Sequence, residues 1–443
     1  MSQTFRRNQP EVVPVVIGSS YNAYGIIRSF AEEGIRSILV TGRKKCFAQY
    51  SKYLEKHISL PEANADPEGF VSGLLKLGKA LSPRRGMFFP THDEHLIAIA
   101  KHADVLSAYF ETPFSEWEVC REIIDKATFR ARCEALGIPT IRECLANSLP
   151  EALQCLEILR LPVIVKGNSV ETDTGRFFPG GKMVFYDRSE YESHMRHFFE
   201  GLPGESLLVQ EYIEDSDRNM PDVNCFTDRN GIMQCVFICE KIRQYPPKTG
   251  TSTAMNAVWP DTPKYQTIIE YTQKILKGFR FYGLSGTEFK YDPREKNYKI
   301  IETNIRSEFP NYLQTLVGQN MPYQLYLYHL GREVTIPYYP PEKSAQCAVP
   351  FNDYFFTVHL NKLNYKDAAL TRKAWKATRL KPSTGYGLTA RDIRPFLYAY
   401  ATSIPKGLNA YFRIKNNIPH NVHTLDYIRR GKRAQRLSSN HKA

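Results

Sequence analysis

Carboxylate, amide and guanidinium side chains gather in one stretch of this sequence, residues 284–306. Residues 284–291 and 298–306 are rich in β-branched and aromatic side chains, and residues 292–297 between them have the polar composition of a turn. This pattern predicts a β-hairpin. The chemistry of the stretch therefore depends on which side chains the two strands bring to the same face.

Four side chains of this hairpin could bind a metal ion and a phosphate. Side chains alternate along a strand, so Glu302, Asn304 and Arg306 share one face, and closure about Glu295 puts Glu288 opposite Glu302. Two adjacent carboxylates repel unless a cation lies between them, and the amide oxygen of Asn304 suits Mg²⁺. Arg306 would then meet the anion that the metal carries. Taken alone, the stretch fits a solvated surface hairpin equally well.

Two lysines and a glycine-rich loop lie closer to the N-terminus. Lys126 falls in the middle of a helix predicted over residues 117–136, and Lys166 ends a short strand over residues 161–166. The loop that follows, residues 167–182, contains four glycines and could close its backbone N–H groups over phosphates. The loop lacks the GxxxxGK[ST] spacing, which excludes a P-loop.

The first part of the chain has the pattern of an α/β domain. Residues 12–40 read strand, turn, helix, strand, the start of a parallel sheet. The turn over residues 18–25 lacks the GxGxxG fingerprint, which argues against a NAD or FAD site. A third strand, residues 87–90, precedes Asp93, which is either a ligand at the carboxyl end of the sheet or the N-cap of the next helix.

Length and composition indicate a folded protein of about three domains, since 443 residues exceed a single core. A net charge of +13 favours anionic partners, and residues 411–443 hold eight Lys or Arg against one acidic residue. The nine cysteines include no CxxC pair, so we expect reduced, mostly buried thiols in a cytoplasmic protein. No run approaches the ~20 apolar residues of a membrane span, and the N-terminus lacks a signal peptide core.

The motifs come in an order that resembles the ATP-grasp superfamily: DK, VIVK, a glycine loop, VQEYI, GTEFKYD and IETNIR. The resemblance covers roughly residues 12–330. Within the superfamily, the segment NIRSEFPNYLQTLVGQN, residues 304–320, is similar to the D-aspartate ligase type of carboxylate–amine ligase.

This resemblance implies an ATP site. It makes Lys126 and Lys166 the phosphate-binding lysines, and it places Gly180 and Gly181 in a flap over the triphosphate.

The same resemblance implies the contacts of the nucleoside. Glu211 would accept from the adenine amino group, and the backbone of Tyr212 and Ile213 would read the adenine edge. Asp217 is assigned to the ribose, although the usual Gly-Asp-Asp arrangement is replaced here by Glu-Asp-Ser-Asp. The alternatives for the ribose are Asp215 and Asp222.

The implied catalytic residues extend the hairpin site. Glu288, Glu302 and Asn304 would hold magnesium, while Arg243 and Arg306 would neutralise the substrate carboxylate and an acyl phosphate. Both arginines could instead be ordinary surface ion-pair partners.

The fold implied is α/β, with α+β character in the catalytic part. An N-terminal Rossmann-like domain (residues 1–115) would precede an ATP-grasp domain (residues 116–330), whose small lid subdomain spans about residues 140–212. A helical, basic extension (residues 331–443) would follow.

The implied reaction is ATP-dependent ligation of a carboxylate to an amine through an acyl phosphate, with D-aspartate or a similar amino acid joined to the lysine amine of a peptidoglycan precursor. One alternative is a ligase that makes another peptide or natural product. Another is a nucleic-acid-binding protein with a degenerate ATP-grasp fold, which the retained carboxylates disfavour. The aromatic and basic composition of the C-terminal part fits a helix packed on the catalytic body, or contact with the inner face of an anionic membrane.

Overall fold

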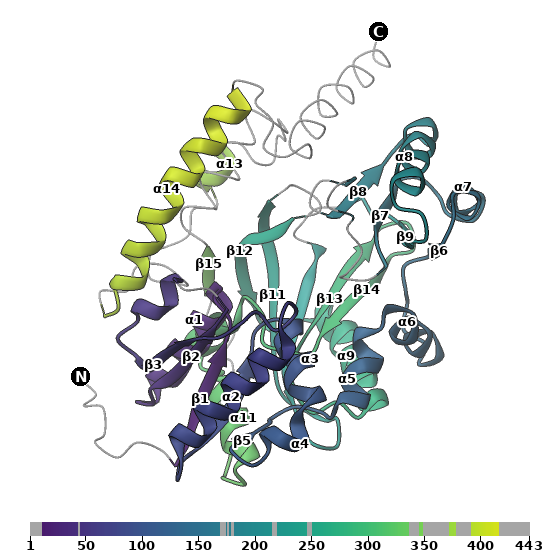
Figure 1. Ribbon diagram of the computed structural model, residues 1–443. Helices are drawn as coiled ribbons and strands as arrows, with labels where there is room; N and C mark the ends of the chain where they lie inside the picture. The colour runs from purple at the N-terminus through teal and green to yellow at the C-terminus, as the bar shows by residue number, and fades with distance from the viewer. Residues whose placement is uncertain are drawn as a thin grey trace.

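The computed structural model describes residues 11–42, 45–168, 174, 177–178, 181–214, 219–245, 250–335, 345–348, 372–377 and 391–415. In this part of the chain, three sheets are arranged around a central space, with the N-terminal sheet and the long central sheet below and a smaller sheet at the upper right (Figure 1).

The N-terminal sheet is parallel throughout, as the βαβ pattern predicted. Its strands in spatial order are β3 (Leu54–Ser59), β2 (Ser37–Thr41), β1 (Val12–Ile17), β4 (Arg85–Pro90) and β5 (Phe110–Glu111). The associated helices are α1 (Tyr21–Glu32), the 3₁₀ helix η1 (Phe47–Tyr50), α2 (Pro67–Leu81), α3 (Asp93–Lys101) and α4 (Ala103–Leu106). Strands β1, β2 and β4 are almost fully buried, because helices cover both faces of a parallel sheet. This domain is therefore Rossmann-like, although no dinucleotide fingerprint is present.

The central sheet is antiparallel and contains the predicted hairpin. Its strands in spatial order are β14 (Asn297–Asn304), β13 (Gly283–Asp292), β10 (Pro221–Thr227), β11 (Met233–Tyr245), β12 (Thr251–Val258) and β15 (Gln346–Ala348). The helices of this region are α9 (Pro263–Phe279), α10 (Asn311–Leu316) and α11 (Met321–His329). Apolar side chains of this sheet and of the N-terminal sheet belong to the same two buried clusters. The two sheets are therefore packed together as one body.

The small sheet has a hydrophobic core of its own. Its strands in spatial order are β6 (Glu143–Ala146), β9 (Leu207–Glu211), β7 (Val163–Gly167) and β8 (Lys182–Phe185), with helices α7 (Leu149–Ile158) and α8 (Arg188–Gly201). The buried cluster of this sheet contains only residues between 146 and 209. Among the described residues, no buried apolar cluster joins this part to the rest, and it is called the lid below.

The predicted helix over residues 117–136 is broken into α5 (Trp117–Ile124) and α6 (Lys126–Ala135). Asp125 lies at the break, where its carboxylate accepts a hydrogen bond from the backbone N–H of Thr128 and caps α6. The placement of Lys126 in mid-helix was therefore wrong. Lys126 is the first residue of α6.

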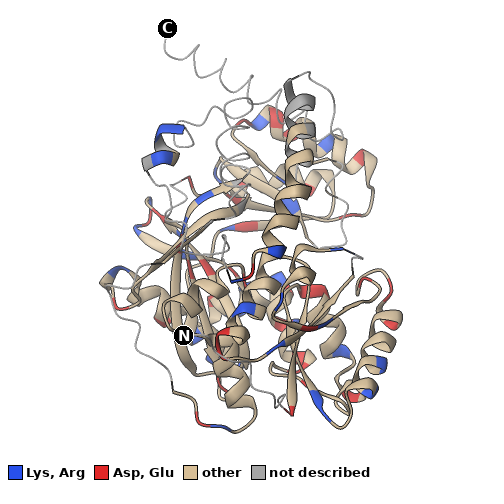
Figure 2. Cartoon of the chain, turned by 90° about the vertical axis from the view of Figure 1, so that its left-hand side faces the viewer, with Lys and Arg blue, Asp and Glu red and all other residues tan. Residues whose placement is uncertain are grey.

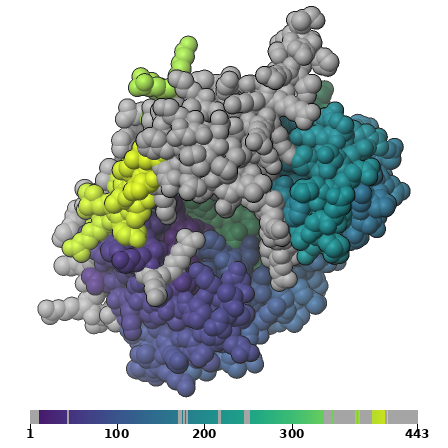
Figure 3. All heavy atoms as spheres, turned by 45° about the horizontal axis from the view of Figure 1, so that its top comes forward, coloured from purple at the N-terminus to yellow at the C-terminus, as the bar shows by residue number. Residues whose placement is uncertain are grey.

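The C-terminal part contributes α13 (Arg372–Ala377) and α14 (Arg394–Lys415). Asp392, just before α14, is buried and accepts hydrogen bonds from the hydroxyls of Tyr24 and Ser51 at 3.0 and 2.5 Å. Tyr398 of α14 packs on Tyr50 of η1, with ring centroids 4.7 Å apart. The helix therefore lies along the N-terminal domain, at the left edge of Figure 1 and in yellow in Figure 3.

The remaining expectations from composition can also be compared with the structure. All nine cysteines are free, and all except Cys144 are buried, as predicted. Within the described ranges, no helix is both long and apolar enough to cross a membrane. Basic and acidic residues are interspersed along the chain in the cartoon of Figure 2.

Candidate functional site

Two large cavities meet where the lid, the hairpin and the N-terminal domain approach each other. Their volumes are about 960 and 890 Å³. Lys126, Lys166, Glu302 and Asn304 line both of them. Four of the residues predicted to bind nucleotide or metal are thus brought to one place, although they come from three separate elements.

A row of carboxylates crosses the face of the central sheet at this point. Glu288 of β13 pairs with Glu302 of β14 on one side and with Asp222 of β10 on the other. Directly opposed residues project from the same face, so all three line the 890 Å³ cavity. Burial acts to raise the pKa of Glu288, but the Lys241 ammonium, 2.9 Å away, together with Lys182 and Arg306 lowers the pKa overall.

The pairing of Glu288 with Glu302 was predicted correctly, but the closure of the hairpin was not. Near the turn, Asp292 pairs with Asn297 and Phe289 with Ile300, a register one residue short of symmetric closure about Glu295. A β-bulge beyond Phe289 then shifts the pairing by one residue. The bulge therefore restores the opposition of the two glutamates.

Asn304 and Arg306 extend the site toward the N-terminal domain. The side-chain N–H groups of Asn304 donate to Glu308 at 2.6 Å and to Glu302 at 3.3 Å, and its amide oxygen accepts from Arg306 at 3.1 Å. The guanidinium of Arg306 also donates to Asp93 at 2.7 Å. Asp93 is the first residue of α3 and not its N-cap, which is His92. Arg306 is thus part of an ion pair that joins the hairpin to the N-terminal domain.

Three lysines approach the carboxylates from the lid side. Lys126 donates to the carbonyl oxygens of Gly167 and Asn168 at 3.0 and 3.2 Å, so it is held against the end of β7. Burial lowers the pKa of Lys126, and the neighbouring charge of Lys166 lowers it further. Lys182 is opposite Lys166 across β7 and β8, and burial lowers its pKa as well. Clustered cations of this kind suit an anionic polyphosphate.

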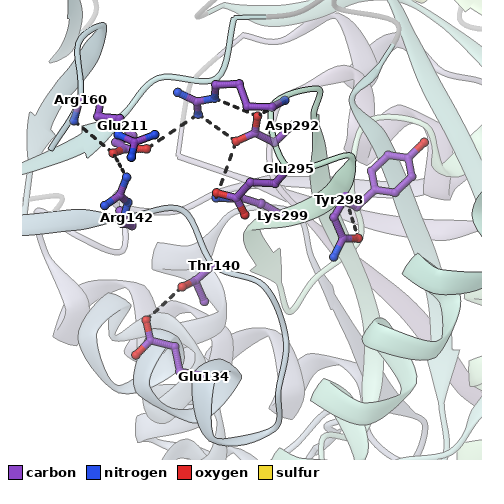
Figure 4. Close-up of polar contacts among 11 residues, drawn as sticks. Glu134, Thr140, Arg142, Arg160, Glu211, Asp292, Glu295, Tyr298 and Lys299 are labelled. Carbon is purple, nitrogen blue, oxygen red and sulfur yellow. Dashed lines mark hydrogen bonds and ion pairs between the residues drawn. The ribbon is translucent and has the colours of Figure 1, made fainter.

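Glu211 makes contacts that the sequence did not reveal. Its buried carboxylate lies 2.9 Å from the Arg142 guanidinium and 3.8 Å from that of Arg294, and it accepts from the backbone N–H of Arg160 (Figure 4). Arg294 in turn holds Asp292 at 2.8 Å. The Arg294 ion pair joins the lid to the turn of the hairpin, while the Arg142 and Arg160 contacts lie within the lid, so the carboxylate is engaged structurally even though the residue lines the cavity.

The other predicted nucleoside contacts are only partly described. Tyr212 and Ile213 line the 890 Å³ cavity, but the backbone N–H of Tyr212 donates to Pro162 at 2.8 Å, so it is not available to adenine. Gly181 adopts a positive φ of 78°. Three predicted residues lie outside the described part of the chain. They are Gly180 of the glycine loop and the two ribose candidates Asp215 and Asp217.

Arg243 and Lys241 both lie on β11, but only Lys241 faces the site. Arg243 is buried and is not among the residues that line the two cavities, whereas Lys241 and Gln244 are. A register irregularity in β11 between Lys241 and Gln244 changes the alternation of its side chains. Arg243 is thus not among the described residues at either cavity, its role at the substrate stays a prediction, and Lys241 is the cation that sequence reasoning missed.

Asp222 and Glu308 form a buried acidic pair beside Glu288. Asp222 is 3% exposed and Glu308 is 8% exposed. Burial, reinforced by the charge of Glu288, raises the pKa of Asp222 to about 6. Burial and the charges of Asp222 and Glu288 raise the pKa of Glu308 well above its ordinary value. Asp222 thus lies at the metal end of the site, beside Glu288.

The oxygen atoms that these residues carry are of the kind that binds magnesium. Glu288 and Glu302 face each other, and the Asn304 amide lies beside them, with its N–H group toward Glu302 and its oxygen held by Arg306, so that the oxygen would turn to the ion. No group of three or more His, Cys, Asp or Glu side chains in the described ranges is arranged to hold a metal ion. Two carboxylates and an amide therefore have to share the ion with phosphate oxygens and water, as is usual for Mg²⁺ with a nucleotide.

Comparison with protein families supports a nucleotide site. Residues 125–313 match the family described as the ATP-binding domain of the carbamoyl-phosphate synthase L chain. D-aspartate ligase from Enterococcus faecium (strain Aus0004) is 27% identical over 326 residues, which cover 70% of this chain and 75% of that protein. The C-terminal section of the carbamoyl phosphate synthase large chain from Methanopyrus kandleri is 27% identical over 188 residues, 41% of this chain and 32% of that one.

Solved structures share the fold. The L-amino acid ligase from Bacillus licheniformis superposes with a TM-score of 0.57 at 16% identity, over 77% of this chain and 79% of that one. N5-carboxyaminoimidazole synthetase from Staphylococcus aureus, complexed with ADP, gives a TM-score of 0.59 at 14% identity, over 78% and 84% of the two chains. The fold of this chain is thus shared with both proteins, the second of which was solved with ADP.

We predict that Glu302→Gln lowers Mg²⁺-dependent ATP turnover by at least roughly 100-fold, because a direct ligand should matter more than the outer-shell partners whose loss costs about 10–100-fold. The matched control is Glu295→Gln, in the turn of the same hairpin, where the side chain is 56% exposed. Phosphate release from ATP measures the effect, and circular dichroism checks the fold. Turnover in Glu302→Gln equal to that of the control would contradict the metal site.

We also predict that Lys126→Met and Lys166→Met each weaken ATP binding by roughly 10- to 100-fold, the range for a lost hydrogen bond to a charged group. Lys101→Met is the control, since Lys101 lines the neighbouring cavity but lies over the ring of Trp117. Calorimetric titration with a non-hydrolysable ATP analogue gives the Kd values. Unchanged affinity in both lid-side variants would mean that the lysines do not contact phosphates.

Proposed function

Because the chain is an ATP-dependent ligase of the ATP-grasp superfamily, we propose that it activates the carboxylate of an amino acid, D-aspartate or a close relative, and joins it to the lysine amine of a peptidoglycan precursor. The observation that carries the proposal is the convergence of Glu288, Glu302 and three lysines on one cavity. D-aspartate is suggested by the Enterococcus faecium relative.

The proposed reaction has two transfers. A carboxylate oxygen of the amino acid attacks the γ-phosphorus of ATP, the bond to the β-phosphate oxygen breaks, and ADP leaves. The amine nitrogen then attacks the acyl carbon, the carbon–oxygen bond to phosphate breaks, and the amine loses a proton. Magnesium, when bound, would neutralise charge on the phosphate oxygens during the first transfer. The chain needs no Ser or Cys nucleophile for this sequence.

Different residues around the cavity would bind the phosphates and the metal, at two ends of the site. Lys126, Lys166 and Lys182 would hold the phosphates, because their ammonium groups are clustered on the lid side. Glu288 and Glu302 would hold the metal. Among the nucleoside contacts, the backbone of Ile213 and the carbonyl of Tyr212 would face the adenine edge, and Asp217 stays the proposed ribose ligand.

We propose that the lid, about residues 140–212, closes over ATP as a unit. Its separate core allows this motion, and the ion pair of Glu211 with Arg294 marks the contact that has to be kept or exchanged during closure. Residues 1–115 and 116–330 would form the remaining two parts of the catalytic body. Their shared core would keep the metal site rigid while the lid moves.

A peripheral contact with an anionic membrane is proposed for α14. Ile393, Leu397, Ile404 and Leu408 are 42–58% exposed. At 3.6 residues per turn the last three fall within roughly 40° of arc, on the side away from the buried Ala399. The helix contains four basic residues and no acidic one, and it faces the viewer in Figure 2. An apolar stripe on a basic helix suits the headgroup region at the inner face of the membrane.

We predict that D-aspartate stimulates phosphate release from ATP above its background and that a lysine-containing cell-wall peptide stimulates it further. A panel of D- and L-amino acids, each with and without the peptide, is assayed with Mg²⁺, and the amide product is identified by mass spectrometry. An acyl phosphate mechanism requires the amino acid for turnover and the amine for product. Stimulation by a different amino acid would favour another peptide ligase, and stimulation by none would contradict ligase activity.

We predict that the full-length chain sediments with vesicles of anionic lipid at low salt and is released as the salt concentration rises. Leu397→Gln combined with Leu408→Gln should weaken sedimentation several-fold. The control Ile158→Gln, at an apolar residue 57% exposed on the lid helix α7, should bind as wild type does. Equal binding by wild type and the double variant would remove α14 from membrane contact.

A further inference from the structure

Three buried oxygen atoms from distant parts of the chain line one wall of the same cavity. They are the Ser20 hydroxyl oxygen, one carboxylate oxygen of Asp222 and one of Glu308. All three atoms are buried, and buried polar atoms are normally hydrogen-bonded. Their gathering on one wall indicates a binding subsite distinct from the Glu288 and Glu302 pair.

The sheet register explains how Glu308 reaches this wall. Gly286 lies between Asn224 and Asn304 in the neighbouring strands, and a Cβ on Gly286 would overlap the Glu308 carboxylate. The glutamate therefore lies over the bare backbone of the glycine, in the row next to Glu288 and Asp222. One of its oxygens is held by Asn304 at 2.6 Å, and its carboxyl group lies against that of Asp222, with which it can share a proton.

The N-terminal domain supplies Ser20 in a fixed position. Ser20 comes just before α1, and the Asn22 side chain donates to the Ser307 carbonyl at 2.5 Å. Asn311 returns a hydrogen bond to the Asn22 carbonyl at 2.9 Å. The loop that contains Ser20 is thus fastened to the segment that contains Glu308, so the two side chains keep their relation when a ligand enters.

The oxygen atoms of this wall suit a cation that has several hydrogen-bond donors. Two carboxyl groups buried side by side are unfavourable unless a positive charge joins them, and Lys241 already donates to Glu288. An ammonium group has three N–H donors, and the three buried oxygens offer it three acceptors once it displaces the proton between Asp222 and Glu308.

We propose that Ser20, Asp222 and Glu308 bind the ammonium group of the amino acid whose carboxylate is activated, a specificity subsite that rests on the proposed ligase function. An ammonium held by three acceptors has no lone pair for attack, so the wall suits the spectator ammonium and not the attacking amine. Asp222 is one strand from Glu288, about 4.7–4.9 Å across the sheet. That distance suits an ammonium whose own carboxylate lies at the metal.

The test compares an amino acid with its des-amino analogue. The values of kcat/KM for D-aspartate and for succinate are measured by phosphate release in wild type, Asp222→Asn, Glu308→Gln and Ser20→Ala. Wild type should prefer D-aspartate, and the two carboxylate variants should lower the preference ratio by roughly 10- to 100-fold, the range for a lost hydrogen bond to a charged group. Ser20→Ala should lower it less. General damage changes both rates together and leaves the ratio as it was.

Asp228→Asn is the matched control, because Asp228 follows the other end of β10 and bonds only within its own loop in the described contacts, including the backbone N–H groups of Asn230 and Ile232. Its ratio should stay at the wild-type value. An unchanged ratio in active Asp222→Asn and Ser20→Ala, or a wild-type ratio near one, would overturn the subsite. If the enzyme prefers another amino acid over the des-amino analogue of that amino acid, the same test is run with that pair in place of D-aspartate and succinate. Turnover with no amino acid at all would overturn the ligase function, and the subsite with it.

Discussion

The repulsion between carboxylates on neighbouring strands is the constraint on which this site depends. Glu302, Glu288 and Asp222 stand in one row across β14, β13 and β10, with Glu308 in the next row. Such a row is stable only where cations face it. Lys241 and Lys182 from the protein supply part of that charge, and Arg306 adds to it from the edge of the sheet. Nucleotide-bound metal and a substrate ammonium would supply the rest.

The same constraint accounts for how the parts of the molecule are joined. The central sheet and the N-terminal domain share their buried apolar clusters, so the carboxylate row has a rigid base. The lid has a separate core and meets this base mainly through polar groups, including the ion pair of Glu211 with Arg294 and the Lys126 contacts with β7. An enclosing part that is held by charge and not by apolar burial can open and close at low energetic cost.

Much of the fold and part of the site could be predicted from the sequence. Alternation along β14 identified Glu302 and Asn304, and the βαβ pattern identified the parallel sheet. The predicted pairing of Glu288 with Glu302 was right, although the turn is one residue shorter than predicted, because a β-bulge compensates for the difference. Side-chain alternation in the sequence gives no signal for this bulge. Lys241 was missed because irregular register on β11 decides whether it or Arg243 faces the cavity. The Arg306–Asp93 pair joins residues 213 positions apart, beyond any local pattern.

Metal-dependent nucleotide binding shows most directly whether the carboxylate row is a metal and phosphate site. Calorimetric titration of the full-length chain with a non-hydrolysable ATP analogue is carried out with Mg²⁺ and again with EDTA, for wild type and for Glu288→Gln. We expect wild type to bind at least about tenfold more tightly with Mg²⁺, the equivalent of roughly 1.4 kcal/mol, and this dependence to be lost in the variant. Equal Kd values for wild type with and without the metal would contradict the account.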